Sequence, residues 1–194
     1  MRVVAGELRG RRIDAPEGDS TRPTTDKVRE AVFNALGSLG AVDGAVVVDL
    51  FAGSGGLGIE AISRGASSCT FVENDKRALA VLRGNIDALG IGERSGVVAL
   101  DLVRETSGSE SLRLRELLAG ATLILADPPY GFPAWGKVFS AAGAADPSAV
   151  VVVETEARAS IHDDAPSGWT LVRKRDYGRT TVGFFVRDVA KDDA

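Results

Sequence analysis

Short apolar runs that alternate with helical patterns are the feature that most constrains the fold of this chain. The first run spans residues 45–50 and is apolar except for Asp49 near its end. Such a run is typical of a parallel strand that is buried on both faces. Segments with apolar residues at helical spacing separate it from the runs that follow. The alternation therefore predicts a doubly wound α/β sheet.

The expected elements follow this alternation to the end of the chain. We expect strands over residues 45–50, 69–72, 96–100, 121–126, 149–153, 169–173 and 181–186. We expect helices over residues 58–64, 76–89, 112–118 and 135–142, and a further helix that begins near Thr25 and carries Val28, Val32, Leu36 and Leu39 on one face. The last two strands have no helix-length spacer between them, so they should form an antiparallel hairpin at one edge. Residues 2–5 and 11–13 should form a short hairpin of their own.

Length and composition favour one globular domain. The chain has 194 residues, of which 44% are hydrophobic and 26% charged, as is typical of globular proteins. We expect an extension over residues 1–24, the main domain over residues 25–188 and a disordered tail over residues 189–194. No apolar run approaches the ~18 residues of a transmembrane helix, and we do not expect the first residues to form a secretory signal.

Cysteine and histidine are too rare to support some classes of site. Cys69 is the single cysteine, which allows no internal disulfide and fits a reducing cytoplasm. His162 is the single histidine, so a His-based metal centre and a Ser–His–Asp triad are not expected, and it should lie on the surface. We therefore expect a cytoplasmic protein without a membrane segment and without a metal.

A glycine-rich turn follows the first strand. Gly53, Gly55 and Gly58 form a GxGxxG pattern, which brings backbone amides and a helix N-terminus close to a ligand. Glu73 lies twenty residues after Gly53, at the end of the next strand, where a carboxylate can accept ribose hydroxyls. This spacing also fits a dinucleotide site. Asp49, however, lies four residues before Gly53 and suits an amino or sulfonium group better than two phosphates.

A second motif, Asp127-Pro128-Pro129-Tyr130, follows the fourth strand. The two prolines fix the backbone and remove two amide donors. The turn therefore presents acceptors, which are the Asp127 side chain and the Pro128 carbonyl. Tyr130 adds a flat face for stacking. Such a set suits a planar ring that carries an exocyclic NH₂ group.

Together the two motifs resemble a class I S-adenosylmethionine-dependent methyltransferase of the amino-methylating type. The resemblance implies a seven-stranded Rossmann-like sheet with the last strand antiparallel, and S-adenosyl-L-methionine as cofactor. It places Asp101 where the family contacts the adenine amino group. The implied cofactor-binding residues are Asp49, Phe51, Gly53, Ser54, Gly55, Glu73, Asn74, Asp101 and Leu102. The implied catalytic residues are Asp127, Pro128, Pro129 and Tyr130.

Motifs near both ends narrow the resemblance to the RsmD family. They are Arg2-Val3-Val4-Ala5-Gly6, Arg9-Gly10-Arg11-Arg12, Thr21-Arg22-Pro23-Thr24, residues 28–34, and Asp176-Tyr177-Gly178-Arg179-Thr180. This resemblance implies methyl transfer to the exocyclic N2 of a guanine in small-subunit ribosomal RNA.

Basic residues cluster although the net charge is −4. Local field rather than net charge governs phosphate binding, so the clusters predict RNA contacts. The residues concerned are Arg9, Arg11, Arg12, Arg22, Arg173, Lys174, Arg175 and Arg179. We expect the RNA to be presented within a ribosomal particle, and the protein to act as a monomer.

Two other functions fit parts of the pattern. Transfer to adenine N6 in DNA or RNA uses the same Asp-Pro-Pro-Tyr chemistry, but the chain shows no target-recognition domain for it. A nicotinamide-dependent oxidoreductase, or a nucleotide-binding module without catalysis, fits the glycine turn. An oxidoreductase would need a further catalytic domain, for which 194 residues leave no room.

Overall fold

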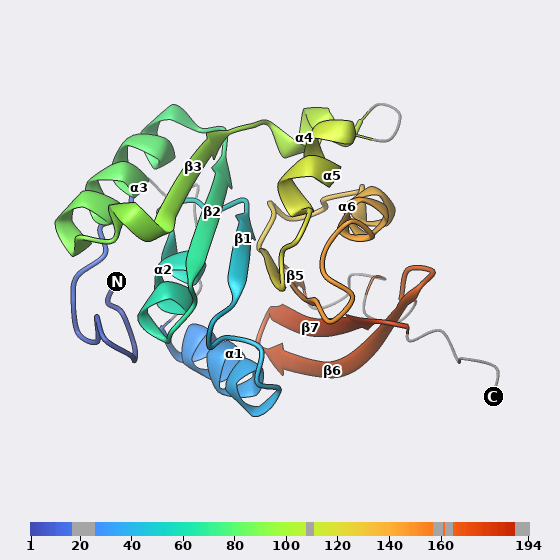
Figure 1. Ribbon diagram of the computed structural model, residues 1–194, viewed down its shortest axis with the longest axis horizontal. Coiled ribbons are helices and arrows are strands. Elements are labelled where there is room, and N and C mark those ends of the chain that lie inside the picture. Colours follow the sequence, from blue (N-terminus) through green and yellow to red (C-terminus); the bar gives the residue numbers. More distant parts are fainter. Residues whose placement is uncertain (17–25, 108–110, 157–160, 162–164, 189–194) are drawn as a thin grey trace.

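A single mixed sheet of seven strands, in the order β3-β2-β1-β4-β5-β7-β6, forms the centre of the molecule (Figure 1). The computed structural model describes residues 1–16, 26–107, 111–156, 161 and 165–188. The strands are β1 (Val46–Leu50), β2 (Ser68–Glu73), β3 (Ser95–Ala99), β4 (Leu123–Ala126), β5 (Val150–Glu156), β6 (Trp169–Tyr177) and β7 (Thr180–Arg187). Strands β1 to β5 pair in parallel, and β7 runs antiparallel to both of its neighbours, β5 and β6. The seven-stranded sheet with an antiparallel last strand is therefore confirmed.

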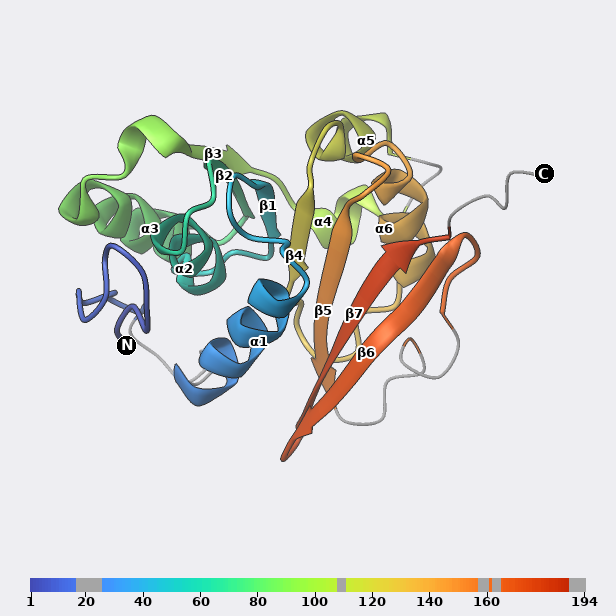
Figure 2. The same ribbon diagram turned by 60° about the horizontal axis from the view of Figure 1, so that its bottom comes forward.

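Helices cover both faces of this sheet (Figure 2). They are α1 (Asp26–Ser38), α2 (Gly56–Ser63), α3 (Lys76–Leu89), α4 (Leu102–Glu105), α5 (Leu112–Leu118) and α6 (Trp135–Ala142), with a 3-10 turn over Gly92–Arg94. Helices α1, α2 and α3 share one hydrophobic core with one face, and α4, α5 and α6 share a second core with the other. The strands are apolar on both faces because each face is covered: Val47 lies in the first core and Val48 in the second.

Periodicity located most helices well. The bounds expected for α3, α5 and α6 coincide with those observed. Helix α1 stops at Ser38, so Leu39, which was expected on its apolar face, lies just beyond it and is 40% exposed. Gly40 adopts a left-handed conformation with φ 65°, which is typical of a residue just beyond a helix end. Helix α4 was not expected; Asp101 caps it by accepting a hydrogen bond from Arg104 N at 3.1 Å.

The amino-terminal segment, residues 1–16, folds back on itself without forming the two expected strands. One isolated antiparallel bridge joins Arg2 and Arg12. The backbone N–H groups of Val4 and Ala5 instead donate to the carboxylate of Glu60 on α2, at 2.8 and 3.1 Å. A backbone amide bonded to a side chain is not free for a strand ladder, which explains why the pairing stays short.

Some expected features lie outside the described residues. These are the Thr25 cap, the Thr21-Arg22-Pro23-Thr24 motif, His162 and residues 189–194. Within the ranges that the structure describes, no helix is long and apolar enough to cross a membrane.

Candidate active site

Acidic side chains gather at the carboxyl ends of the parallel strands. Glu73 ends β2, Asp127 follows β4, and Glu154 lies on β5. Asp49 lies near the end of β1. In open α/β sheets, ligands bind outside this edge. The strands therefore collect four carboxylates, far apart in sequence, where a ligand is expected.

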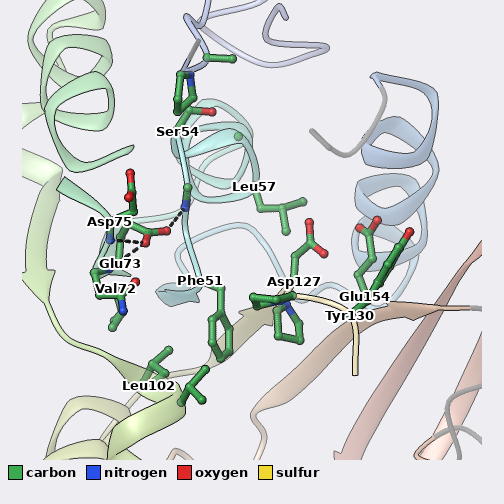
Figure 3. A pocket seen from close by; sticks show the side chains of 18 of the residues that line it. Phe51, Ser54, Leu57, Val72, Glu73, Asp75, Leu102, Asp127, Tyr130 and Glu154 are labelled. Carbon is green, nitrogen blue, oxygen red and sulfur yellow. Dashed lines mark hydrogen bonds between the residues drawn. The ribbon is translucent and has the colours of Figure 1, made fainter. Parts of the chain in front are cut away.

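A cavity of about 640 Å³ opens in front of this edge. The first strands and the glycine turn line one end, and the Asp127-Pro128-Pro129-Tyr130 turn lines the other (Figure 3). Its lining includes Phe51, Gly53, Ser54, Leu57, Val72, Glu73, Asn74, Asp101, Leu102, Asp127, Pro128, Pro129, Tyr130, Glu154, Tyr177 and Thr180. Seven of the nine expected cofactor-binding residues and all four expected catalytic residues are among the lining residues.

The glycines of the GxGxxG pattern meet two kinds of constraint, one on backbone conformation and one on close packing. Gly53 and Gly55 have φ of 55° and 89°, in the left-handed region that favours glycine. A Cβ atom on Gly58 would lie 2.4 Å from the Phe71 ring of β2, so this glycine allows α2 to approach the sheet closely. Phe51 also has a positive φ, of 63°, which is uncommon for a bulky residue.

Asp49 lies beneath the glycine turn rather than in the cavity. It is 1% exposed, and its Oδ2 accepts a hydrogen bond from Gly58 N at 2.9 Å. Burial raises the pKa of Asp49 to about 7; the Gly58 bond lowers it, and the charges of Asp127 and Glu73 raise it further. The expectation that Asp49 and Gly55 line the cleft is thus corrected. A carboxylate bonded to the first turn of α2 positions that turn from below.

Glu73 is held at the cavity wall by the backbone. Its Oε2 accepts from Gly53 N at 2.8 Å, and its Oε1 accepts from Asn74 N and Asp75 N at 2.7 and 2.9 Å. Figure 3 shows these three bonds. An ionised carboxylate offers about four lone-pair sites, so Glu73 can accept a further donor from a ligand.

Apolar side chains extend this end of the cavity. Phe51, Val72 and Leu102 all line it, and the Phe51 ring meets Phe132 edge to face at 5.1 Å. Asp101 lies at the same wall with one carboxylate oxygen already bonded to Arg104 N. A slot of this kind can take a flat ring whose polar edge meets Asp101.

The Asp-Pro-Pro-Tyr turn forms the other wall. Asp127 is half-buried and Pro128 is buried, whereas Tyr130 is 60% exposed. In Figure 3 the Tyr130 ring lies beside the carboxylates of Asp127 and Glu154. The turn therefore presents acidic oxygens next to an accessible aromatic face.

The predicted RNA-binding residues that the structure describes lie outside the cavity. Arg9, Arg11 and Arg12 are exposed on the amino-terminal segment, where Arg11 donates to Ala88 O at 2.6 Å and Arg12 pairs with Asp14 at 2.7 Å. Ala15 and Pro16 of the same segment line the cavity.

The second basic group lies on and after β6. Arg173 donates to Ser38 Oγ at 3.1 Å, and Lys174, Arg175 and Arg179 are exposed. Arg179 follows Tyr177 closely in the chain, and Tyr177 lines the cavity. Helix α1 lies between the two basic groups in both views, so they approach the cavity from different sides (Figures 1 and 2).

Glu154 and Arg29 are among the cavity-lining residues that sequence reasoning missed. Glu154 directly follows the four valines of β5, and Asp49 follows the three valines of β1. An acidic residue at the end of an apolar run could therefore have identified Glu154 as well. Arg29 of α1 lines the cavity while its side chain is fully buried, bonded to Glu60 and Asp26. No sequence signal distinguishes Arg29 from an exposed helix arginine.

Known proteins resemble this chain over nearly its full length. "Ribosomal RNA small subunit methyltransferase D" of Escherichia coli is 29% identical over 191 residues, covering 97% of this chain and 90% of the relative. Its namesake from Haemophilus influenzae is 30% identical and covers 92% and 89%. The family model described as "Conserved hypothetical protein 95" matches residues 1–186. The chain belongs to the RsmD family.

Solved structures agree with RsmD-family membership. The Escherichia coli protein yhhF superposes with a TM-score of 0.78 at 28% identity, covering 97% of this chain and 98% of that one. The Pyrococcus horikoshii protein PH1948 has a TM-score of 0.72 at 19% identity, which shows the shared fold. The RsmD-family chain is therefore a methyltransferase with a Rossmann-like sheet.

Proposed function

We propose that this chain transfers a methyl group from S-adenosyl-L-methionine to the exocyclic N2 of a guanine in small-subunit ribosomal RNA. One observation carries the proposal: Glu73 and the Asp127-Pro128-Pro129-Tyr130 turn line the same cavity of about 640 Å³. The first suits a ribose and the second suits an aromatic amine. The names of the Escherichia coli and Haemophilus influenzae relatives support ribosomal RNA as the substrate.

The residues present fit S-adenosyl-L-methionine. Glu73 keeps acceptor capacity for a ribose hydroxyl, and the slot of Phe51, Val72 and Leu102 suits adenine, with Asp101 beside its amino group. The carboxylates at the strand ends favour a positively charged ligand. When bound, the cofactor supplies an electrophilic methyl group on a positively charged sulfur.

The Asp-Pro-Pro-Tyr turn would prepare the guanine. Its N2 lone pair is delocalised into the ring, which makes it a poor nucleophile. Hydrogen bonds donated by the NH₂ group to Asp127 and to the Pro128 carbonyl draw electron density toward nitrogen. These bonds strengthen as nitrogen becomes positive during transfer, so they stabilise the transition state more than the ground state. The released proton passes to water or to Asp127.

Tyr130 and the basic groups would hold the RNA. The base must leave its stack to enter the cavity, and stacking on Tyr130 contributes ~1–3 kcal/mol. The arginines of the amino-terminal segment and of β6 supply phosphate contacts on two sides. Because both groups are short, we propose that a monomer recognises RNA already shaped within a ribosomal particle.

Mapping the methylated nucleoside tests this function. Small ribosomal subunits and free 16S RNA from a strain that lacks the enzyme are incubated with the protein and methyl-labelled cofactor. We expect label in N2-methylguanosine, and more of it in subunits than in free RNA. The control uses subunits from the parent strain, which still has the enzyme and whose target guanine is therefore already methylated. Label in N6-methyladenosine, or no incorporation, would contradict the proposal.

A further inference from the structure

We infer that Glu154 reads the Watson–Crick edge of the target base and selects guanine over adenine. This inference rests on the function proposed above and assigns its specificity to one residue. It concerns a different side chain from those of the Asp-Pro-Pro-Tyr turn.

Strand register places Glu154 beside Asp127. Strand β4 pairs with β5 so that Ala126 is the partner of Val153; Asp127 directly follows the end of β4, and Glu154 is the next residue of β5. Neighbouring strands lie ~4.8 Å apart. Side chains alternate between faces along a strand, and Val152 belongs to the core under α1 to α3, so Glu154 lies on that face; Asp127 lines the same cavity as Glu154.

Glu154 also reaches the cavity that Asp127 and Tyr130 line. It is 9% exposed, and Figure 3 shows its carboxylate next to the Tyr130 ring, with Asp127 on the other side of the same space. A base stacked on Tyr130 would therefore present its edge to two carboxylates from adjacent strands.

Two adjacent carboxylates match guanine. Its edge carries the N1–H donor beside the N2 amine, so Glu154 can accept the N1–H while Asp127 and the Pro128 carbonyl accept the two N2–H donors. Bonds to a charged acceptor are stronger than neutral ones, especially where water is excluded. Adenine would instead turn its N1 lone pair toward the Glu154 carboxylate. Sites that hydrogen-bond a substrate group discriminate strongly against analogues lacking it.

The experiment uses two substrates that share the N2 amine and differ at N1 and at the 6-oxo group. Small subunits are reconstituted with 16S RNA carrying either guanine or 2-aminopurine at the mapped target position. 2-Aminopurine keeps the N2 amine, but its N1 is an acceptor without a proton. One lost bond to a charged group corresponds to about tenfold to a hundredfold in kcat/KM. We expect the wild-type protein to prefer guanine by that factor.

Glu154→Gln should remove the preference. The amide can donate to N1 of 2-aminopurine, so the guanine to 2-aminopurine ratio should fall to within about threefold of unity. Glu154→Asp keeps the carboxylate and should keep the preference at a lower rate. The matched control is Glu156→Gln, which changes a residue of the same strand outside this cavity. Glu156 accepts a hydrogen bond from Gly131 N at 3.5 Å, and the glutamine amide oxygen can still accept it.

The outcomes separate the two proposals. A Glu154→Gln variant with normal thermal unfolding and an unchanged preference would overturn the role of Glu154 alone. A Glu154→Asp variant that loses the preference would overturn it as well. A wild-type protein that methylates neither substrate would overturn the proposed function together with this inference.

Discussion

At the scale of single residues, hydrogen-bond partners give the four carboxylates different tasks. Glu73 is bonded to three backbone amides and Asp49 is buried under Gly58. Asp127 and Glu154 line the cavity next to Tyr130. The same chemical group therefore fixes the chain at one end of the site and lines the open cavity at the other.

Replacing Glu73 should weaken cofactor binding. Glu73→Ala removes a charged acceptor for a ribose hydroxyl and releases Gly53 N. A bond to a charged group contributes ~1.5–3 kcal/mol, so affinity for S-adenosylmethionine should fall about tenfold or more. Calorimetric titration measures it, and Glu73→Gln, which keeps one acceptor oxygen, should lose less. If Glu73→Ala folds normally and its affinity for S-adenosylmethionine is unchanged, Glu73 does not bind the ribose.

Replacing Asp127 should slow transfer and leave cofactor binding nearly unchanged. The lost bond matters most as nitrogen becomes positive, so kcat should fall more than KM rises. By analogy with loss of one preorganised transition-state partner, Asp127→Ala should reduce the rate ~10²-fold or more. Asp127→Asn, whose amide oxygen still accepts one bond, should be milder. Single-turnover rates on subunits decide this; a wild-type rate for Asp127→Ala would make the turn merely structural.

Asp49 should make stability depend on pH. Its folded pKa of about 7 lies above the ordinary value of 3.8, so the folded state holds a proton that the unfolded state releases between these values. Stability should therefore fall as pH rises from about 4 to 7, by at most ~1.4 kcal/mol per unit, and level off above 7. Asp49→Asn keeps an acceptor for Gly58 N and should lack this slope. Urea unfolding at several pH values gives the difference; parallel curves for the two proteins would refute it.

Sequence patterns predicted which residues lie at the candidate site better than they predicted what each residue does there. Asp127, Tyr130 and Glu73 lie in one cavity as expected, because their motifs follow strand ends and strand ends share an edge. The burial of Asp49 was not predictable, since it depends on how closely α2 approaches β2 at Gly58. Whether each residue contacts cofactor or RNA stays a prediction.

At the scale of elements, the amino-terminal segment combines a buried side with an exposed basic side. Val3 and Ile13 are buried in the core with α1, α2 and α3, while Arg9 and Arg12 are exposed. The segment adjoins the cavity through Ala15 and Pro16. It can therefore carry phosphate contacts at a fixed position relative to the site.

Removing the arginines of this segment should weaken RNA binding alone. Replacing Arg9, Arg11 and Arg12 with alanine should lower affinity for small subunits and reduce the salt slope by ~0.7–0.9 per lost phosphate contact. Cofactor affinity should not change. Arg113→Ala, at an exposed site on α5 across the sheet, is the control. Equal binding and equal salt slopes would show that these arginines do not contact the RNA.

Element bounds were predictable where apolar spacing is regular. Helices α3, α5 and α6 show this, because the apolar residues of each helix point to a single core, the first core for α3 and the second for α5 and α6. The amino-terminal strands failed for a reason that no local pattern contains, namely the long-range bonds from Val4 and Ala5 to Glu60. Helix α4 is too short to show a period.

At the scale of the whole molecule, Glu60 joins three parts of the chain. It is fully buried on α2 and accepts from Val4 N, from Arg64 Nε at 2.6 Å and from Arg29 Nε on α1 at 3.4 Å. Arg29, also fully buried, contacts the carbonyl of Arg2. This ion pair thus holds the amino-terminal segment, α1 and α2 together beside the cavity.

Glu60→Gln should destabilise the protein. Breaking a buried ion pair costs about 3–5 kcal/mol, and the lower figure applies here because Arg29 still pairs with Asp26 at 2.8 Å. Urea unfolding measures the loss, and hydrogen exchange at Val4 and Ala5 shows whether the segment detaches first. Glu30→Gln, exposed beside Arg29, should stay within about 0.5 kcal/mol of wild type. A stability loss no larger than this control's would contradict the role given to Glu60.

The position of β6 gives its basic residues a second consequence. Strand β6 is nine residues long and forms one of the two edges of the sheet, opposite β3. An exposed strand edge is a template for pairing with another chain, and charged side chains discourage such pairing. We therefore expect Arg173, Lys174 and Arg175 also to discourage pairing of this edge with another chain. A variant stripped of them to test RNA contact should be examined by light scattering, because growth of fibrillar or amorphous particles would mimic a loss of RNA affinity.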